Sequence, residues 1–198
     1  MERIELHPIF DRYTVYNDHY DGELSAPGDM LGRDCMIAAF LPRQIDFFRL
    51  YRGDGSKNED WFSWNAPVYA PISGKVTEIF INGVTNTPGR MNPSRASSII
   101  IQAEDGTLIT LAHIQSPEVA VGDTVKKGQL VARVGNNGFS RNPHIHVGAY
   151  RDGKPLMIGF DAEKVGALRW SLDECYWIMG ISDEEFAALK EGESGSNA

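Results

Sequence analysis

The middle of the chain is a series of short apolar and β-branched runs, each of which ends at turn residues. The runs cover residues 68–81, 98–102, 107–112 and 123–134. Glycine, asparagine and proline separate them, and helical periodicity is absent from residues 67–150. This pattern is typical of short strands joined by turns, so the sequence predicts a mainly β protein.

The length and charge of the chain restrict what it can do. A chain of 198 residues, 42% of them hydrophobic, can bury a core and favours a single domain. The formal net charge of −8 argues against a nucleic-acid partner, because phosphates require a basic surface. It also disfavours a protein that binds membrane surfaces through basic residues. No apolar run approaches the ~18 residues that would indicate a membrane span.

The N-terminus and the cysteines bear on the compartment. Residues 1–8 contain acids where a secretory signal has bases, and they include no apolar segment, so we expect no signal peptide there. Cys35 and Cys175 lie far apart and form no CxxC pair. Two buried thiols are expected in preference to a disulfide, because free cysteine is commonly buried. These features leave the compartment undecided.

The patterns outside the middle segment are shorter. The expected elements are strands over residues 36–40 and 45–51, a loop over 20–32 and an aromatic cover packed on the core over 163–180. Ser182 and Glu185 form a capping box that predicts a short C-terminal helix ending near residue 190. The polar tail over residues 191–198 is expected to be disordered.

Two histidines, His144 and His146, lie at the start of an expected strand. Side chains alternate along a strand, so these imidazoles share a face with Cα atoms ~6.6 Å apart, while Ile145 points into the core. Two imidazoles on one face suit zinc chemistry, in which one binds the metal and the other reaches its water. An isolated His-x-His pair also occurs as two polar residues on an exposed strand face.

A third histidine, His113, closes the apolar strand over residues 108–113. A histidine in such a place can simply be a solvated strand end. Residues 122–130, however, predict a tight hairpin that reverses the chain, so the loop before His144 can return beside His113. We therefore expect His113, His144 and His146 to converge on a single site.

Four sequence blocks occur in order between residues 66 and 146. They read Ala-Pro-Val-Tyr-Ala-Pro-x-x-Gly-x-Val at 66–76, Leu-Ala-His at 111–113, Val-Gly-Asp-x-Val-x-x-Gly-Gln at 121–129 and Gly-Asn-x-Gly-x-Ser-x-x-Pro-His-Ile-His at 135–146. Together the blocks resemble the lysostaphin-type peptidoglycan endopeptidases over about residues 43–150. This resemblance implies an antiparallel β domain with a central groove, the duplicated hybrid motif fold.

The resemblance also implies a zinc metallopeptidase that hydrolyses a peptide bond in peptidoglycan cross-bridges or stem peptides. His146 would be a zinc ligand, and His113 and His144 would be the catalytic histidines beside the water that zinc acidifies. A periplasmic, cell-wall or secreted location would follow. The rival hypothesis is a degenerate member that keeps the groove as a binding or regulatory module. A lipoyl or biotinyl carrier domain is disfavoured, because neither Lys126 nor Lys127 lies at the tip of a turn.

The family also requires a histidine and an aspartate from an early strand. Asp46 lies among apolar residues that resemble the family's aspartate strand, and a carboxylate there needs a metal or an ion pair. His19 is the nearest upstream histidine and completes the expected ligand set. An alternative register places Met30 and Asp34 on the family's His-x-x-x-Asp spacing, although a thioether is a poor zinc donor. Cys35 is a further candidate on its chemistry alone.

The expected organisation has four parts. They are an N-terminal extension packed on the core (1–42), the metallopeptidase-like domain (43–150), a C-terminal cover with a short helix (151–190) and the tail (191–198). Residues 82–95 and 136–142 should form the walls of the groove, where Arg90 or Arg141 could meet a substrate carboxylate. The alternative is that these loops are connectors and the arginines are solvated.

Overall fold

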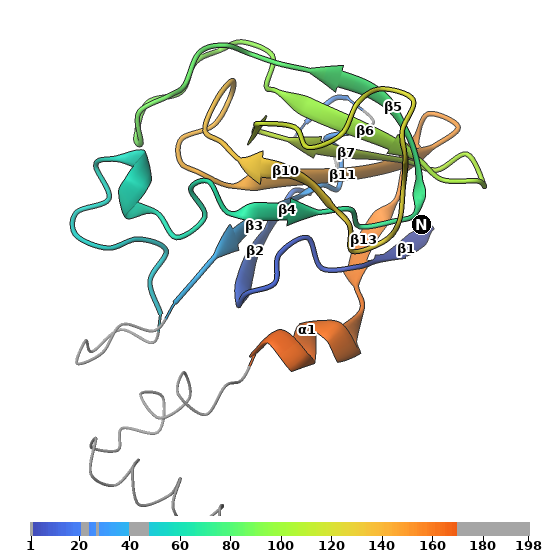
Figure 1. Cartoon of the computed structure of the whole chain (residues 1–198), viewed down its shortest axis with the longest axis horizontal. Coiled ribbons are helices and arrows are strands. Elements are labelled where there is room, and N and C mark those ends of the chain that lie inside the picture. Colours follow the sequence, from blue (N-terminus) through green and yellow to red (C-terminus); the bar gives the residue numbers. More distant parts are fainter. Residues whose placement is uncertain (1, 21–23, 27, 40–47, 170–198) are drawn as a thin grey trace, which may run out of the picture.

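An eight-stranded sheet is the largest element of the computed structural model, which describes residues 2–20, 24–26, 28–39 and 48–169 (Figure 1). Its strand order is β2 (Thr14–Asp18), β3 (Arg33–Ile37), β11 (Ile145–Arg151), β7 (Leu108–Ala112), β6 (Ser98–Gln102), β5 (Gly74–Phe80) and β9 (Thr124–Val125), with β12 (Lys154–Pro155) paired to β11. Every pair in this sheet is antiparallel. The predicted mainly β, antiparallel fold is therefore confirmed.

Two smaller sheets and two helices complete the described part of the chain. The strands β4 (Pro67–Tyr69), β10 (Leu130–Val134) and β8 (Ile114–Gln115) form an antiparallel sheet, and β1 (Arg3–Leu6) pairs in parallel with β13 (Met157–Phe160). The helices are the 3-10 turn η1 (Asn58–Asp60) and α1 (Ala162–Arg169). Among the described residues, no helix is both long and apolar enough to cross a membrane.

The core lies against one face of the large sheet. Alternate residues of its central strands are fully buried, and these are Ile99, Ile101, Ile109, Leu111, Ile145, Val147 and Ala149. They belong to one cluster with Val68, Ile114, Val131 and Val134 of the three-stranded sheet. Because side chains alternate along a strand, His146 on β11 and Ala112 on β7 face the opposite side. That side carries the groove described below.

The residues expected to form an N-terminal extension supply two strands of the large sheet. β3 begins at Arg33, before the strand expected over residues 36–40, because Arg33 and Asp34 pair with β11 as well as with β2. Of the strand expected over 45–51, residues 45–47 lie outside the described part of the chain. Arg49 and Tyr51 form isolated bridges only, to Ala39 and Trp61.

The hairpin expected over residues 122–130 is wrong. β9 pairs with β5 in the large sheet, whereas β10 pairs with β4 and β8 in the small one. Gly122 and Gly128, with φ values of +100° and +84°, form the turns on either side of β9. The chain still returns as expected, because Val134 pairs with Ile114 and the Gly135 N–H donates to the His113 carbonyl at 2.9 Å.

Several predicted features fall outside the described residues. They are the helix ending near residue 190, the tail over 191–198, Cys175 and the aromatic cover beyond residue 169. Cys35 is fully buried on β3, as expected for a packed thiol.

Candidate metal centre and active site

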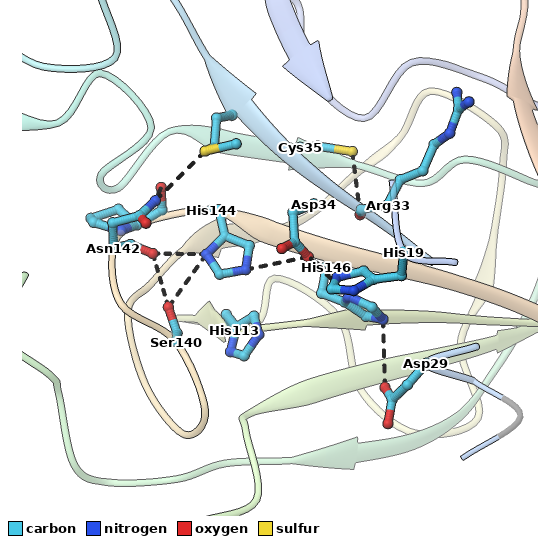
Figure 2. Close-up of polar contacts among 12 residues, drawn as sticks. His19, Asp29, Arg33, Asp34, Cys35, His113, Ser140, Asn142, His144 and His146 are labelled. Atoms are coloured by element: carbon cyan, nitrogen blue, oxygen red, sulfur yellow. Dashed lines mark hydrogen bonds and ion pairs between the residues drawn. The ribbon is translucent and has the colours of Figure 1, made fainter. Parts of the chain in front are cut away.

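Three histidines lie together at one end of the central strands. His113 directly follows β7, and His144 and His146 lie at the start of β11, where His146 pairs with Ala112. The ring centroids of His113 and His144 are 4.5 Å apart, and those of His113 and His146 are 6.5 Å apart. All three residues are buried. The expected convergence of these histidines is confirmed (Figure 2).

Two further groups reach this cluster from the β2–β3 pair at the edge of the sheet. His19 follows β2, and Asp34 lies on β3 directly opposite His146. Asp34 Oδ1 is 3.0 Å from His146 Nδ1, 3.2 Å from His19 Nε2 and 3.5 Å from His144 Nε2. Three imidazole nitrogens therefore surround one carboxylate oxygen (Figure 2).

Part of this cluster has the chemistry of a metal site. Ligand atoms of His19, Asp34 and His146 all lie within 4.8 Å of one another. Two imidazoles with one carboxylate are a donor set of catalytic zinc sites, which keep a further position open for water or substrate. Neutral imidazoles supply lone pairs and Asp34 supplies negative charge. These residues therefore fit a zinc ion.

The structure brings some of the candidate metal ligands together and places others elsewhere. The structure brings His19 and His146 together, whereas Asp46 lies outside the described residues and its role stays a prediction. The carboxylate beside His146 belongs to Asp34, which only the alternative register had aligned with a metal-binding position. Cys35 is the next residue on β3, but it is fully buried in the core cluster with its Sγ 3.7 Å from the Arg33 carbonyl oxygen. Its thiol does not belong to the group.

Asp34 is held in its ionised form. Burial by itself raises the pKa of this carboxyl. The interactions with His144 and His146 lower it more, so the pKa of Asp34 lies well below its usual range. A partly buried carboxylate that remains charged is suited to offset the charge of a cation.

His113 and His144 are both oriented by one loop. His113 Nδ1 donates to the Asn137 carbonyl oxygen at 2.8 Å, and His144 Nδ1 donates to the Asn142 carbonyl oxygen at 2.8 Å. A carbonyl oxygen can only accept, so Nδ1 carries the proton in the neutral form of either ring. The free lone pair of each ring is therefore on Nε2.

Both the backbone conformation and the protonation state of His113 are restricted. Its φ is +65°, in the left-handed region that few residues other than glycine and asparagine adopt. Burial, and then the proximity of His144, lower the pKa of His113 from 6.5 to about 3. His113 is therefore neutral at physiological pH.

This pKa predicts an acid-sensitive fold. The folded pKa lies below the unfolded one, so the stabilisation is fully present above about pH 6.5 and is lost as the pH falls towards 3. This group should lower the unfolding free energy of the metal-free protein over that range by on the order of 5 kcal/mol, at about 1.4 kcal/mol per pKa unit. Urea titrations at a series of pH values measure it.

The control variant is His113→Asn, because asparagine tolerates the left-handed backbone. Its pH slope should be smaller between pH 6.5 and 3, while the titratable groups that surround His113, which are Asp34, His144 and His146, stay in place. Equal slopes in the two proteins would contradict the assignment.

The cluster lies in a groove of about 850 Å³. Met91, Ser94 and Arg95 line one part of it, and residues 139–142 line another, so both stretches expected to form the walls contribute to them through their C-terminal residues. Arg141 is one of these lining residues, and its Nε is 3.1 Å from the Met91 sulfur. Arg90 does not line the groove. A third set of lining residues, Leu24, Ala26, Gly28 and Asp29, comes from the loop expected over residues 20–32.

Asparagines hold the wall over residues 136–142 in place. The Asn86 side chain donates to the carbonyls of Gly138 and Ser140, and Asn137 Oδ1 accepts from the Ser97 N–H. Asn136 donates to Asn58 Oδ1 at 2.8 Å. These asparagines thus brace the loop whose Asn137 and Asn142 carbonyls orient His113 and His144.

The chain was compared with protein-family profiles and with solved structures. The sequence profile of peptidase family M23 matches residues 60–158. The M23 metalloprotease pseudoalterin, from the deep sea, is 18% identical over 77% of this chain and 74% of its own, with a TM-score of 0.47. The catalytic domain of the antimicrobial peptidase lysostaphin from Staphylococcus simulans is 23% identical over 70% of this chain and 80% of its own, with a TM-score of 0.41.

A third solved structure is a variant catalytic domain of the prophage-encoded M23 protein EnpA from Enterococcus faecalis. It is 18% identical over 76% of this chain and 92% of its own, with a TM-score of 0.46. The residues matched by the family profile include His113, His144 and His146 but not His19 or Asp34. His19 and Asp34 reach the other three through the pairing of β2 with β3 and of β3 with β11.

Proposed function

Because the chain belongs to peptidase family M23, we propose that it is a zinc-dependent peptidase. Its proposed substrates are the cross-bridges or stem peptides of peptidoglycan. The observation that carries the proposal is the group of His19, Asp34 and His146 with two more histidines beside it. A module that only bound a ligand would have no chemical need for His113 and His144 next to such a group.

The proposed ligands are His19, Asp34 and His146. A zinc ion held there would acidify a water molecule and polarise the carbonyl of the peptide bond. The negative charge of Asp34 favours the cation, and the neutral imidazoles supply lone pairs without adding charge. The buried surroundings of His146 strengthen these interactions, because screening by water is weak there.

His144 is the residue suited to carry a proton during the reaction. Its Nδ1–H is held by the Asn142 carbonyl, so Nε2 is free to take a proton from the attacking water. The resulting imidazolium faces Asp34 Oδ1 across 3.5 Å, which stabilises the charge. The same Nε2–H then protonates the amine nitrogen as the carbon–nitrogen bond breaks.

His113 has a different role, because its lowered pKa keeps it neutral. With Nδ1–H bound to the Asn137 carbonyl, its Nε2 accepts a hydrogen bond and can orient the attacking water. The two histidines are therefore not interchangeable: His144 moves the proton and His113 positions the water.

The proposal predicts stoichiometric zinc and cleavage of cell-wall peptides. Protein purified without chelators is analysed for metal, and products from purified peptidoglycan are identified by mass spectrometry as new free amines. His146→Ala is expected to remove both the zinc and the cleavage. A folded protein that binds no zinc at neutral pH and leaves the peptides intact would instead support a degenerate binding module.

A further inference from the structure

The imidazole of His146 has two sides with different surroundings. Nδ1 lies 3.0 Å from Asp34 Oδ1, within the proposed metal group. Nε2 is buried and has no hydrogen-bond partner among the described residues. The carboxylate facing it belongs to Asp29, whose Oδ1 is 3.5 Å away (Figure 2). Asp29 is 46% exposed, so its side chain has room to move.

The position of the proton explains this geometry. Without a metal, the Asp34 carboxylate accepts the Nδ1–H of His146, which leaves Nε2 without a proton to share with Asp29. If Nδ1 instead binds a cation, the proton of the neutral ring must be on Nε2. A buried N–H then requires an acceptor, and a carboxylate is the usual partner of a metal-binding histidine.

Asp29 is kept near His146 by a tight turn. The Gly32 N–H donates to the Asp29 carbonyl at 3.1 Å, and a Cβ on Gly32 would lie 2.5 Å from His146 Cε1 and 2.7 Å from Nε2. The turn thus packs directly against the edge of the ring that carries Nε2. Gly32 also accepts the backbone N–H of His19 at 2.9 Å, so the turn contacts both proposed histidine ligands.

The same segment is anchored on the sheet. The Gly28 carbonyl oxygen occupies the space that a side chain on Gly148 of β11 would fill. A Cβ on Gly28 would lie 3.0 Å from Thr110 Oγ1 and 3.3 Å from the Tyr150 ring. The turn around Asp29 is therefore seated on β7 and β11, two strands that also carry the site.

From these contacts we propose that Asp29 is a positioning residue, which accepts the Nε2–H of His146 and so presents Nδ1 to the metal. The inference rests on the proposed zinc site. In this role Asp29 acts through His146. Asp29 selects the tautomer of His146 and fixes the plane of its ring. The turn over residues 28–32 holds Asp29 in place.

The test compares the full chain with Asp29→Ala, Asp29→Glu and the control Asp54→Ala, which removes an exposed carboxylate outside the groove. Zinc dissociation constants are measured by competition with a chelator. We expect Asp29→Ala to weaken zinc binding about 10–100-fold, Asp29→Glu to recover part of the loss and Asp54→Ala to have no effect. Nitrogen NMR of the His146 ring should report Nδ1–H without zinc and Nε2–H with zinc.

The outcomes separate this inference from the proposed function. Absence of zinc binding by the unaltered chain overturns both. Unchanged affinity in Asp29→Ala, with zinc still bound by the unaltered chain, overturns only the role of Asp29. Coordination of zinc through His146 Nε2 in the NMR spectra would overturn it as well. Thermal unfolding of the metal-free variants should match the unaltered chain, since the Asp29 side chain is half exposed.

Discussion

Replacing His144 with Ala is expected to lower kcat by about 10²–10⁴-fold while the zinc content stays near that of the unaltered protein. His144 Nε2 is 3.5 Å from Asp34 and is not needed to complete the group of His19, Asp34 and His146. The lower kcat should therefore reflect slower proton transfer and not loss of zinc. Single-turnover cleavage of a cell-wall peptide, measured alongside metal analysis, separates the two effects.

The matched control for that experiment is His7→Ala. His7 lies outside the groove, where its Nδ1 donates to the Pro8 carbonyl at 2.7 Å. Removing this imidazole should leave both turnover and zinc unchanged. If His144→Ala loses its zinc, then His144 is a ligand and the assigned roles of base and ligand are reversed.

The second large effect is expected at Asp34. Asp34→Asn keeps the shape of the side chain but removes the charge to which three imidazoles are directed. Zinc affinity should fall by at least about 100-fold, more than the loss expected for a residue outside the ligand set. Equilibrium competition with a chelator measures it, because a direct titration can miss weak binding.

Asp46→Asn is the paired variant, since the resemblance to the family assigns the aspartate ligand to Asp46. If Asp34 is the ligand, Asp46→Asn should bind zinc like the unaltered chain. The reverse result, with zinc lost in Asp46→Asn and kept in Asp34→Asn, would return the role to Asp46. The Asp34 carboxylate would then serve only as the acceptor for the neighbouring histidines.

The sequence predicts much of the sheet, because its signals there are local. The short β-branched runs of β6 and β7, which end at turn residues, identify these strands without knowledge of their partners, and the alternation of side chains along a strand sets the two faces of β11. The same alternation places His144 and His146 on one face. Local sequence signals do not reveal the order of the strands. The hairpin expected over residues 122–130 is wrong because β9 and β10 belong to different sheets.

The sequence favours Asp46 over Asp34 for a different reason, and it reaches Asp34 only through the alternative register. β3 contains Arg33 and Asp34, whose charge argues against a buried strand when only the sequence is considered. Arg33 pairs with Asp18 on β2, with Nε 2.7 Å from Oδ1, and Asp34 faces the histidines. Both charges are thus offset by groups that are distant in sequence. A pattern of hydrophobicity carries no information about such partners.

Because Asp34 and His146 face each other across paired strands, a change in loop length and a change in strand register would affect the site differently. β3 contacts β11 through three residue pairs, with the carboxylate and the imidazole at the centre. Lengthening or shortening the preceding loop would leave this pair intact. A slip of one residue in β3 would turn the carboxylate into the core and bring the thiol of Cys35 into the groove. The register of β3 against β11 therefore places the site residues. A search for relatives should look for this register, because the number of residues between His19 and Asp34 does not define the site.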